Sequence, residues 1–209
     1  MDCVFYVHGR GGSAGECRHY IPLFPGCEVT GIDLKASVPW EAGREIRDAL
    51  GAIRDRCDSV ILVAVSIGAY FSMCAEIGDL IARAYFVSPI VDMEKLIGDM
   101  MARAGVSESE LRKKRLIQTT SGETLSWEYL RYVRSHPLHW NVPTRILMGE
   151  NDVFTDAETM RAFAQAHGAP LCVMKNAEHW FHTEEQMRFL DEWIGNGEAE
   201  YFKDRGRQT

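Results

Sequence analysis

The sequence predicts an α/β fold, with a mainly parallel sheet of about six strands and helices on both faces. Two observations support this fold class. Short apolar runs rich in β-branched residues alternate with amphipathic helical stretches over most of the 209 residues, which is typical of a parallel sheet covered by helices. Between residues 93 and 140 helical patterns follow one another without a strand. We therefore expect one α/β domain, 1–209, with a small helical cap inserted at 93–140.

The predicted elements follow from apolar periodicity and from start and stop signals. Helices are expected at 40–57 and 67–77. Two capping boxes, Thr155 with Glu158 and Thr183 with Gln186, start the last two helices. The polar tail from Gly195 onward is expected to be mobile. The predicted strands cover residues 3–7, 28–34, 60–65, 84–87, 144–148 and 170–174.

Composition disfavours several kinds of partner. The formal net charge is −7, which suits neither nucleic acid nor an anionic membrane surface. No apolar run is long enough to span a membrane, and the first predicted strand leaves no room for a secretory signal. The cysteines form no CxxC pair, so we expect reduced thiols in a cytoplasmic protein, with no disulfide framework and no metal site. They are Cys3, Cys17, Cys27, Cys57, Cys74 and Cys172.

A glycine-rich turn follows the first strand and fits two kinds of site. Gly9, Gly11 and Ala14, together with Asp33 at the end of the next strand, match a dinucleotide-binding fingerprint. The segment His8–Gly12 also matches an oxyanion loop of the HGxGG type, whose backbone N–H groups stabilise a developing negative oxygen. No Lys-Ser or Lys-Thr pair follows the glycines, which excludes a phosphate-binding P-loop.

Ser66 lies at the corner between the strand 60–65 and the following helix. Ala64 and Gly68, two positions before and after it, are small, as a tight strand-to-helix turn requires. This is the pattern of a nucleophile elbow. An ordinary turn whose serine caps the helix fits the local pattern equally well.

Asp152 and His179 follow two later strands of the predicted sheet. Loops at the carboxyl ends of parallel strands gather at one edge, so these residues and Ser66 are expected to meet there. A serine hydroxyl becomes a nucleophile when an imidazole takes its proton and a carboxylate holds that imidazole in place. The three residues therefore form a candidate Ser-His-Asp triad.

With these motifs the chain resembles the α/β-hydrolase family, from its first strand to its last helix but without the family's first two strands. Ala64–Gly68 is similar to the family's nucleophile motif and His8–Gly12 to its oxyanion loop. Gly149–Asp152 is similar to the acid loop, and His179 lies where the family places its histidine. Position 64 departs from the family, since it is alanine where glycine is usual.

The resemblance implies an α/β-hydrolase fold and a role for each site residue. Ser66 is the implied nucleophile, His179 the base and Asp152 the acid. The backbone N–H groups of Arg10 and Ile67 are the implied oxyanion donors. His182, three residues after His179, is a rival base, and His8 is expected to be a structural hydrogen-bonding residue beneath the loop.

Substrate contacts are expected from apolar side chains near the site. A methionine-containing stripe in the cap could line an acyl pocket, although such a stripe more often serves plain packing. Trp180 adjoins the candidate base. The candidate substrate-binding residues are Met93, Ile97, Met100, Met101, Trp127 and Trp180.

We expect a serine hydrolase that needs no cofactor and acts on a small-molecule acyl substrate, namely a carboxylic ester, a thioester or a small amide. The dinucleotide alternative explains Asp33 but leaves Ser66, Asp152 and His179 without a role. A second alternative is a homologue that binds a ligand without catalysis. The sequence indicates no oligomeric state.

Overall fold

The computed structural model describes residues 1–206, with side chains as far as Lys203. These residues form two compact units. One unit, which we call the sheet unit, comprises Met1–Val91 and the chain from Trp140 onward. The other, the inserted unit, comprises Asp92–His139.

The sheet unit contains a six-stranded sheet in the order β2-β1-β3-β4-β7-β8, which confirms the predicted fold class. Every neighbouring pair of strands is parallel. Strands β1 and β4 are buried along their whole length, since helices cover both faces of the sheet. The strands are β1 (Cys3–Val7), β2 (Glu28–Ile32), β3 (Val60–Val65), β4 (Arg83–Val87), β7 (Thr144–Gly149) and β8 (Leu171–Met174).

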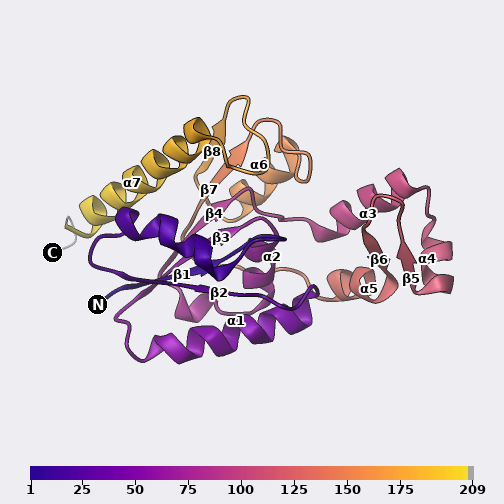
Figure 1. Cartoon of the computed structure of the whole chain (residues 1–209), viewed down its shortest axis with the longest axis horizontal. Helices are drawn as coiled ribbons and strands as arrows, with labels where there is room; N and C mark the ends of the chain where they lie inside the picture. The colour runs from indigo at the N-terminus through magenta and orange to yellow at the C-terminus, as the bar shows by residue number, and fades with distance from the viewer. Residues whose placement is uncertain (207–209) are drawn as a thin grey trace. The chain divides into compact units, whose positions relative to one another are not determined.

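Helices lie on opposite sides of the sheet (Figure 1). On one face the 3-10 segment η1 and helix α7 bury Tyr20 and Trp193 in a cluster with strand residues such as Val4 and Ile61. Helices α1 and α2 pack against each other on the other face. These elements are η1 (Ala14–Leu23), α1 (Pro39–Arg54), α2 (Ile67–Cys74), the short η2 (Gly78–Leu80), α6 (Ala157–Ala166) and α7 (Glu184–Gly206).

The prediction of a mobile tail from Gly195 is wrong as far as Gly206, because α7 continues to that residue. Polar contacts hold its second half against the sheet. The Arg83 guanidinium donates twice to the Glu198 carboxylate, at 2.9 and 2.5 Å, and the Tyr85 hydroxyl donates to the same carboxylate at 2.6 Å. Burial, with this neighbouring carboxylate, raises the pKa of Tyr85, so the hydroxyl keeps its proton. Residues 207–209 lie outside the described part.

One predicted capping box is correct and the other is not. Thr183 and Gln186 cap each other at the start of α7. Helix α6 is capped by Asp156, whose carboxylate accepts from the two N–H groups at 158 and 159, and not by Thr155. Asp156 is placed where its own side chain reaches these groups. Thr155 is buried and contacts another part of the chain.

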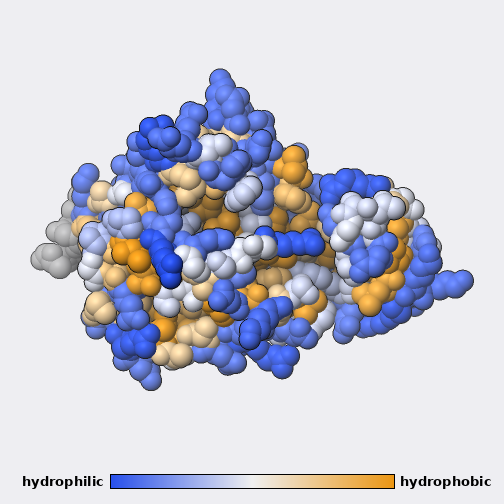
Figure 2. Space-filling view, in the orientation of Figure 1, coloured by the Kyte–Doolittle hydropathy of each residue, from blue (hydrophilic) through white to orange (hydrophobic). Residues whose placement is uncertain are grey.

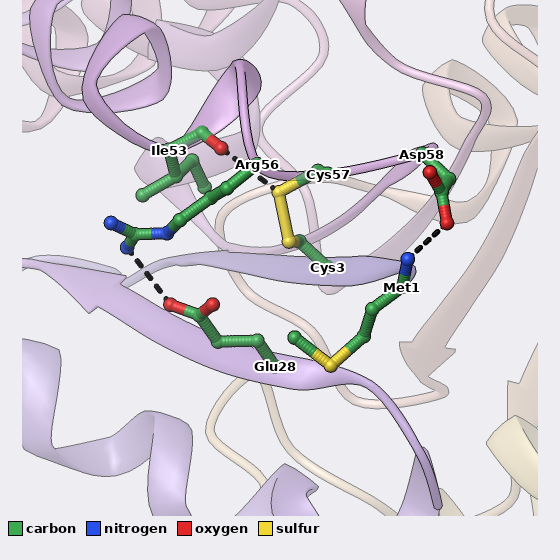
Figure 3. The surroundings of a disulfide bond; sticks show 7 residues. All are labelled: Met1, Cys3, Glu28, Ile53, Arg56, Cys57 and Asp58. Carbon is green, nitrogen blue, oxygen red and sulfur yellow. Dashed lines mark hydrogen bonds and ion pairs between the residues drawn. A yellow bond between two sulfur atoms is a disulfide. The ribbon is translucent and has the colours of Figure 1, made fainter.

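The cysteine prediction is wrong for one pair, since Cys3 and Cys57 form a disulfide (Figure 3). Strand pairing is the reason: Cys3 lies opposite Val60 in the sheet, and Cys57 precedes Val60 by one short loop. The two Cα atoms are therefore 5.6 Å apart despite a sequence separation of 54. Disulfides persist in oxidising compartments, so the cysteines do not support a cytoplasmic location. Cys17, Cys27, Cys74 and Cys172 are free.

The inserted unit is helical at both ends and contains a β-hairpin that the sequence analysis missed. Its strands have three residues each and alternate weakly, and they enclose a turn in which Gly122 has φ +84°. Helix α3 packs against α5 and β6 within this unit. The elements are α3 (Met93–Ala104), α4 (Glu108–Lys114), β5 (Leu116–Gln118), β6 (Thr124–Ser126) and α5 (Trp127–Ser135).

Among residues 1–206 no helix has the length and apolar character needed to cross a membrane. On the visible face in Figure 2, hydrophobic residues form small separate groups among hydrophilic ones. Scattered groups of this kind are ordinary on protein surfaces.

Candidate active site

Ser66 joins β3 to α2 in a strained backbone conformation, with φ 53° and ψ −124°. A positive φ in a residue other than glycine persists where the surrounding structure enforces it, often at functional sites. The Ser66 N–H donates to the Val87 carbonyl at 2.9 Å, and the Ser66 carbonyl accepts from the Ile90 N–H at 3.2 Å. Its side chain makes no capping hydrogen bond to α2, so the helix-cap interpretation is wrong.

The small residues around Ser66 allow close backbone approach. A Cβ on Gly68 would lie 2.4 Å from the His8 carbonyl oxygen and 2.7 Å from that of Val7. A Cβ on Gly9 would lie 3.1 Å from the Cβ of Ser66, so the glycine-rich turn adjoins the serine. Ala64 is fully buried in β3, and its methyl group is accommodated within the sheet.

The loops that carry Asp152 and His179 contact each other backbone to backbone. A Cβ on Gly149, the last residue of β7, would lie 2.3 Å from the Glu178 carbonyl oxygen. The Asn151 N–H donates to the Ala177 carbonyl at 2.8 Å. Since β7 and β8 are neighbouring parallel strands, their carboxyl-terminal loops emerge side by side.

A chain of hydrogen bonds links the three predicted side chains. The Ser66 hydroxyl lies 2.8 Å from His179 Nε2, and His179 Nδ1 lies 2.7 Å from Asp152 Oδ2. A carboxylate only accepts, so Nδ1 carries the proton and Nε2 accepts from the serine. The Asp152 side chain is fully buried, and that of His179 is 14% exposed. The arrangement can therefore move a proton from Ser66 to His179.

The other oxygen of the buried carboxylate is also occupied. Asp152 Oδ1 accepts from the N–H of Phe154 at 2.8 Å and from that of Thr155 at 3.2 Å. The Phe154 ring packs edge-on against the His179 ring, with centroids 4.7 Å apart. Neither residue was predicted as part of the site: Thr155 was expected only to cap the next helix, and Phe154 was marked only by its position soon after the acid.

His8 and Glu16 hold the glycine-rich turn through hydrogen bonds, and Glu16 Oε1 accepts from the Ser13 N–H at 3.1 Å. Buried His8 accepts from the Leu34 N–H at its Nε2, so its Nδ1 donates to the Gly9 carbonyl at 2.6 Å. This confirms the structural role expected of His8. The Tyr6 hydroxyl donates to Glu16 at 2.6 Å, and burial together with its neighbours raises the pKa of Tyr6.

The two predicted oxyanion donors directly follow two residues that lie close together, since Arg10 follows Gly9 and Ile67 follows Ser66. Arg10 belongs to the turn, and Ile67 is the first residue of α2, whose N–H has no acceptor within the helix. In the part of the chain that the structure describes, neither N–H donates to a protein acceptor. Their role as oxyanion donors remains a prediction.

Two residues of the dinucleotide fingerprint, Ala14 and Asp33, bind each other. Asp33 Oδ1 accepts from the Ala14 N–H at 2.6 Å, so the carboxylate expected to hold a ribose occupies the start of the following helical segment. That segment, η1, is a 3-10 helix and not the α-helix of a dinucleotide site. The geometry does not favour this alternative.

The remaining candidates are not part of the hydrogen-bonded chain. His182 Nδ1 hydrogen-bonds the Trp180 carbonyl at 2.8 Å, and the two rings stack. Trp180 is 70% exposed. Trp127 packs beside Arg112 within the inserted unit. A substrate-binding role for Trp180, Trp127, Met93, Ile97, Met100 and Met101 stays a prediction.

The topology and the Ser66 turn define the α/β-hydrolase fold. No protein-family model matches the chain, and no curated protein matches it. Solved structures do. Est1E from Butyrivibrio proteoclasticus is similar, with a TM-score of 0.75 and 17% identity over 97% of this chain and 89% of that one. In another structure Est1E holds ferulic acid.

Two further structures illustrate how widely the fold recurs. A monoacylglycerol lipase from Paleococcus ferrophilus has a TM-score of 0.63 and 18% identity, covering 93% of this chain and 94% of its own. Alpha/beta hydrolase domain-containing protein 10 from mouse has a TM-score of 0.67 and 14% identity, covering 96% and 91%. The similarity extends over nearly the whole chain and confirms the predicted fold.

Proposed function

We propose that this protein is a serine hydrolase that cleaves small carboxylic esters, thioesters or amides. The observation that carries the proposal is the unbroken hydrogen-bond chain from Ser66 through His179 to Asp152. Such a chain supplies the nucleophile, the base and the group that fixes the base's tautomer.

In the proposed reaction His179 takes the hydroxyl proton as Ser66 Oγ attacks the acyl carbon. The N–H groups of Arg10 and Ile67 stabilise the negative oxygen of the tetrahedral intermediate. His179 then gives its proton to the leaving group, and an acyl-enzyme remains. A water molecule, deprotonated by His179, attacks this ester, and the acid leaves as Ser66 regains its proton.

The decisive experiment compares two histidines of one loop. We expect Ser66→Ala and His179→Asn each to lower turnover of p-nitrophenyl acetate by about 10⁴-fold or more, and the double variant to lower it little further. His182→Asn, three residues away, is the matched control and should keep turnover near the unchanged protein's. Wild-type turnover in Ser66→Ala would refute the mechanism.

A fluorophosphonate probe separates the enzyme from a non-catalytic ligand-binding protein. Because the proposed Ser66 is activated, the probe should label this residue and leave Ser66→Ala unlabelled. Folded protein that stays unlabelled would favour the ligand-binding alternative. Since similar structures include a lipase and a ferulic acid complex, the substrate panel should span short and long acyl esters and methyl ferulate.

A further inference from the structure

Thr155 is a buried polar residue beside the site with no part in the proton transfer proposed above. Only 4% of the Thr155 surface is exposed to solvent. It does not cap α6, because Asp156 does so. A buried hydroxyl needs a hydrogen-bond partner. The Thr155 hydroxyl finds its partner 66 residues earlier in the chain.

That partner is a carbonyl on the segment that follows β4. Thr155 Oγ1 donates to the Pro89 carbonyl at 3.1 Å. The same segment holds the serine turn, since the Ile90 N–H donates to the Ser66 carbonyl at 3.2 Å. It is itself anchored to β7 where the Ser88 N–H donates to the Leu147 carbonyl at 2.7 Å.

At its other end Thr155 contacts the acid. Its N–H donates to Asp152 Oδ1 at 3.2 Å. Asp152, Thr155, Pro89, Ile90 and Ser66 therefore form a second connection between acid and serine, made without His179. The first connection passes through the imidazole, which must move a proton during the reaction. The second runs from the Asp152 carboxylate through backbone groups and the Thr155 hydroxyl, and none of these groups transfers a proton in the proposed reaction.

We propose that Thr155 is a positioning residue that sets the distance between Asp152 and the Ser66 turn through its bond to the Pro89 carbonyl. This inference rests on the proposed function. Its physical basis is that reacting groups must be held within a fraction of an ångström, and a small displacement lowers the rate strongly. Without the hydroxyl, the Pro89 carbonyl loses its partner and the acid loop can shift relative to the serine.

The test uses Thr155→Val, which replaces the hydroxyl with a methyl group of similar size, and Thr155→Ser, which keeps the hydroxyl. We expect Thr155→Val to lower kcat about ten- to hundredfold with KM nearly unchanged, and Thr155→Ser to restore kcat to within about threefold. The acidic limb of the pH profile of kcat/KM, where activity falls as the base is protonated, should move to lower pH in Thr155→Val. The reason is that a displaced carboxylate stabilises the imidazolium less.

Thr144→Val is the matched control for loss of a buried hydroxyl. Thr144 is also buried, and its hydroxyl donates to the Val142 carbonyl at 2.7 Å and accepts from Trp140 Nε1. It lies at the opposite end of β7 from the site. Thr144→Val should lower the unfolding midpoint and leave kcat and the pH profile of the folded protein unchanged.

The outcomes separate this inference from the proposed function. All rates are given per active site labelled by fluorophosphonate. Ser66-dependent turnover in the unchanged protein, with wild-type kcat and pH profile in Thr155→Val, would overturn the positioning role alone. Ser66-independent turnover would overturn the proposed function. Should Thr155→Val yield no folded protein, Thr155→Ala removes the same hydroxyl without placing a methyl group against the carbonyl, and the same criteria apply.

Discussion

Two glycines in helices differ in what a methyl group would meet. At Gly68 an added Cβ would lie 2.4 Å from the His8 carbonyl oxygen, whereas at Gly51 it would meet nothing within 4 Å. We expect Gly68→Ala to lower the free energy of unfolding by about 1–3 kcal/mol through overpacking, with loss of activity as the serine turn shifts. Gly51→Ala should raise it by up to about 1 kcal/mol, since alanine favours helix.

Urea denaturation and ester turnover of the two variants check this difference. A Gly68→Ala protein as stable and active as Gly51→Ala would show that the turn tolerates a wider separation between α2 and β1.

At the scale of single residues, residue type and chain order predicted the site. Ser66, Asp152 and His179 follow separate strands, and parallel strands place their ends together. Thr155 was misassigned because a threonine three positions before a glutamate matches a capping box, although Asp156 caps the helix. Its true partner, Pro89, is distant in sequence, and no local pattern reports such a contact.

The second half of α7 depends on one buried ion pair. The Arg83 and Glu198 side chains are 6% and 13% exposed. Removal of the carboxylate in Glu198→Ala leaves a buried guanidinium unpaired, so the free energy of unfolding should fall by about 3–5 kcal/mol. Glu28→Ala, which breaks the exposed pair with Arg56, is the control and should cost less than about 1 kcal/mol. Equal costs in denaturant titrations would contradict this account.

The same ion pair explains why the end of α7 was missed. Helix prediction relies on an apolar stripe, and from Gly195 the residues are mostly polar. The helix is held by charged and aromatic partners on β4, including the Arg83 guanidinium, which lies over the Tyr201 ring. Strands β1, β3 and β4 were predictable because continuous apolar runs have few other stable arrangements.

At the scale of the whole molecule, the disulfide closes a large loop. It joins residues 54 positions apart, and a cross-link of that span stabilises the folded state by about 4 kcal/mol through the entropy of the unfolded chain. Reduction with dithiothreitol should lower the free energy of unfolding by this amount. The Cys3→Ser/Cys57→Ser variant should be insensitive to dithiothreitol; a similar loss in that variant would contradict the assignment.

The order of the strands in the sheet could not be predicted from the sequence. The disulfide depends on that order, so it could not be predicted either. Alternating strands and helices indicate a parallel sheet, but the position of β1 between β2 and β3 comes from long-range packing. Cys3 and Cys57 lie close together because of that order. The hairpin of the inserted unit was missed because three-residue strands carry too little alternation to be distinguished from loop.

The strand order also places Ser66 and His179, between which the proton moves in the proposed reaction, after strands with different numbers of neighbouring strands. Ser66 follows β3, which has strands on both sides, whereas His179 follows β8, a strand of four residues that lies at the edge of the described sheet and pairs with β7. Edge elements open locally at lower free energy than the centre of a sheet. Backbone amides of β8 should therefore exchange with deuterium before those of β3. Activity should be lost at urea concentrations that leave β3 protected, and equal protection of the two strands would rule this out.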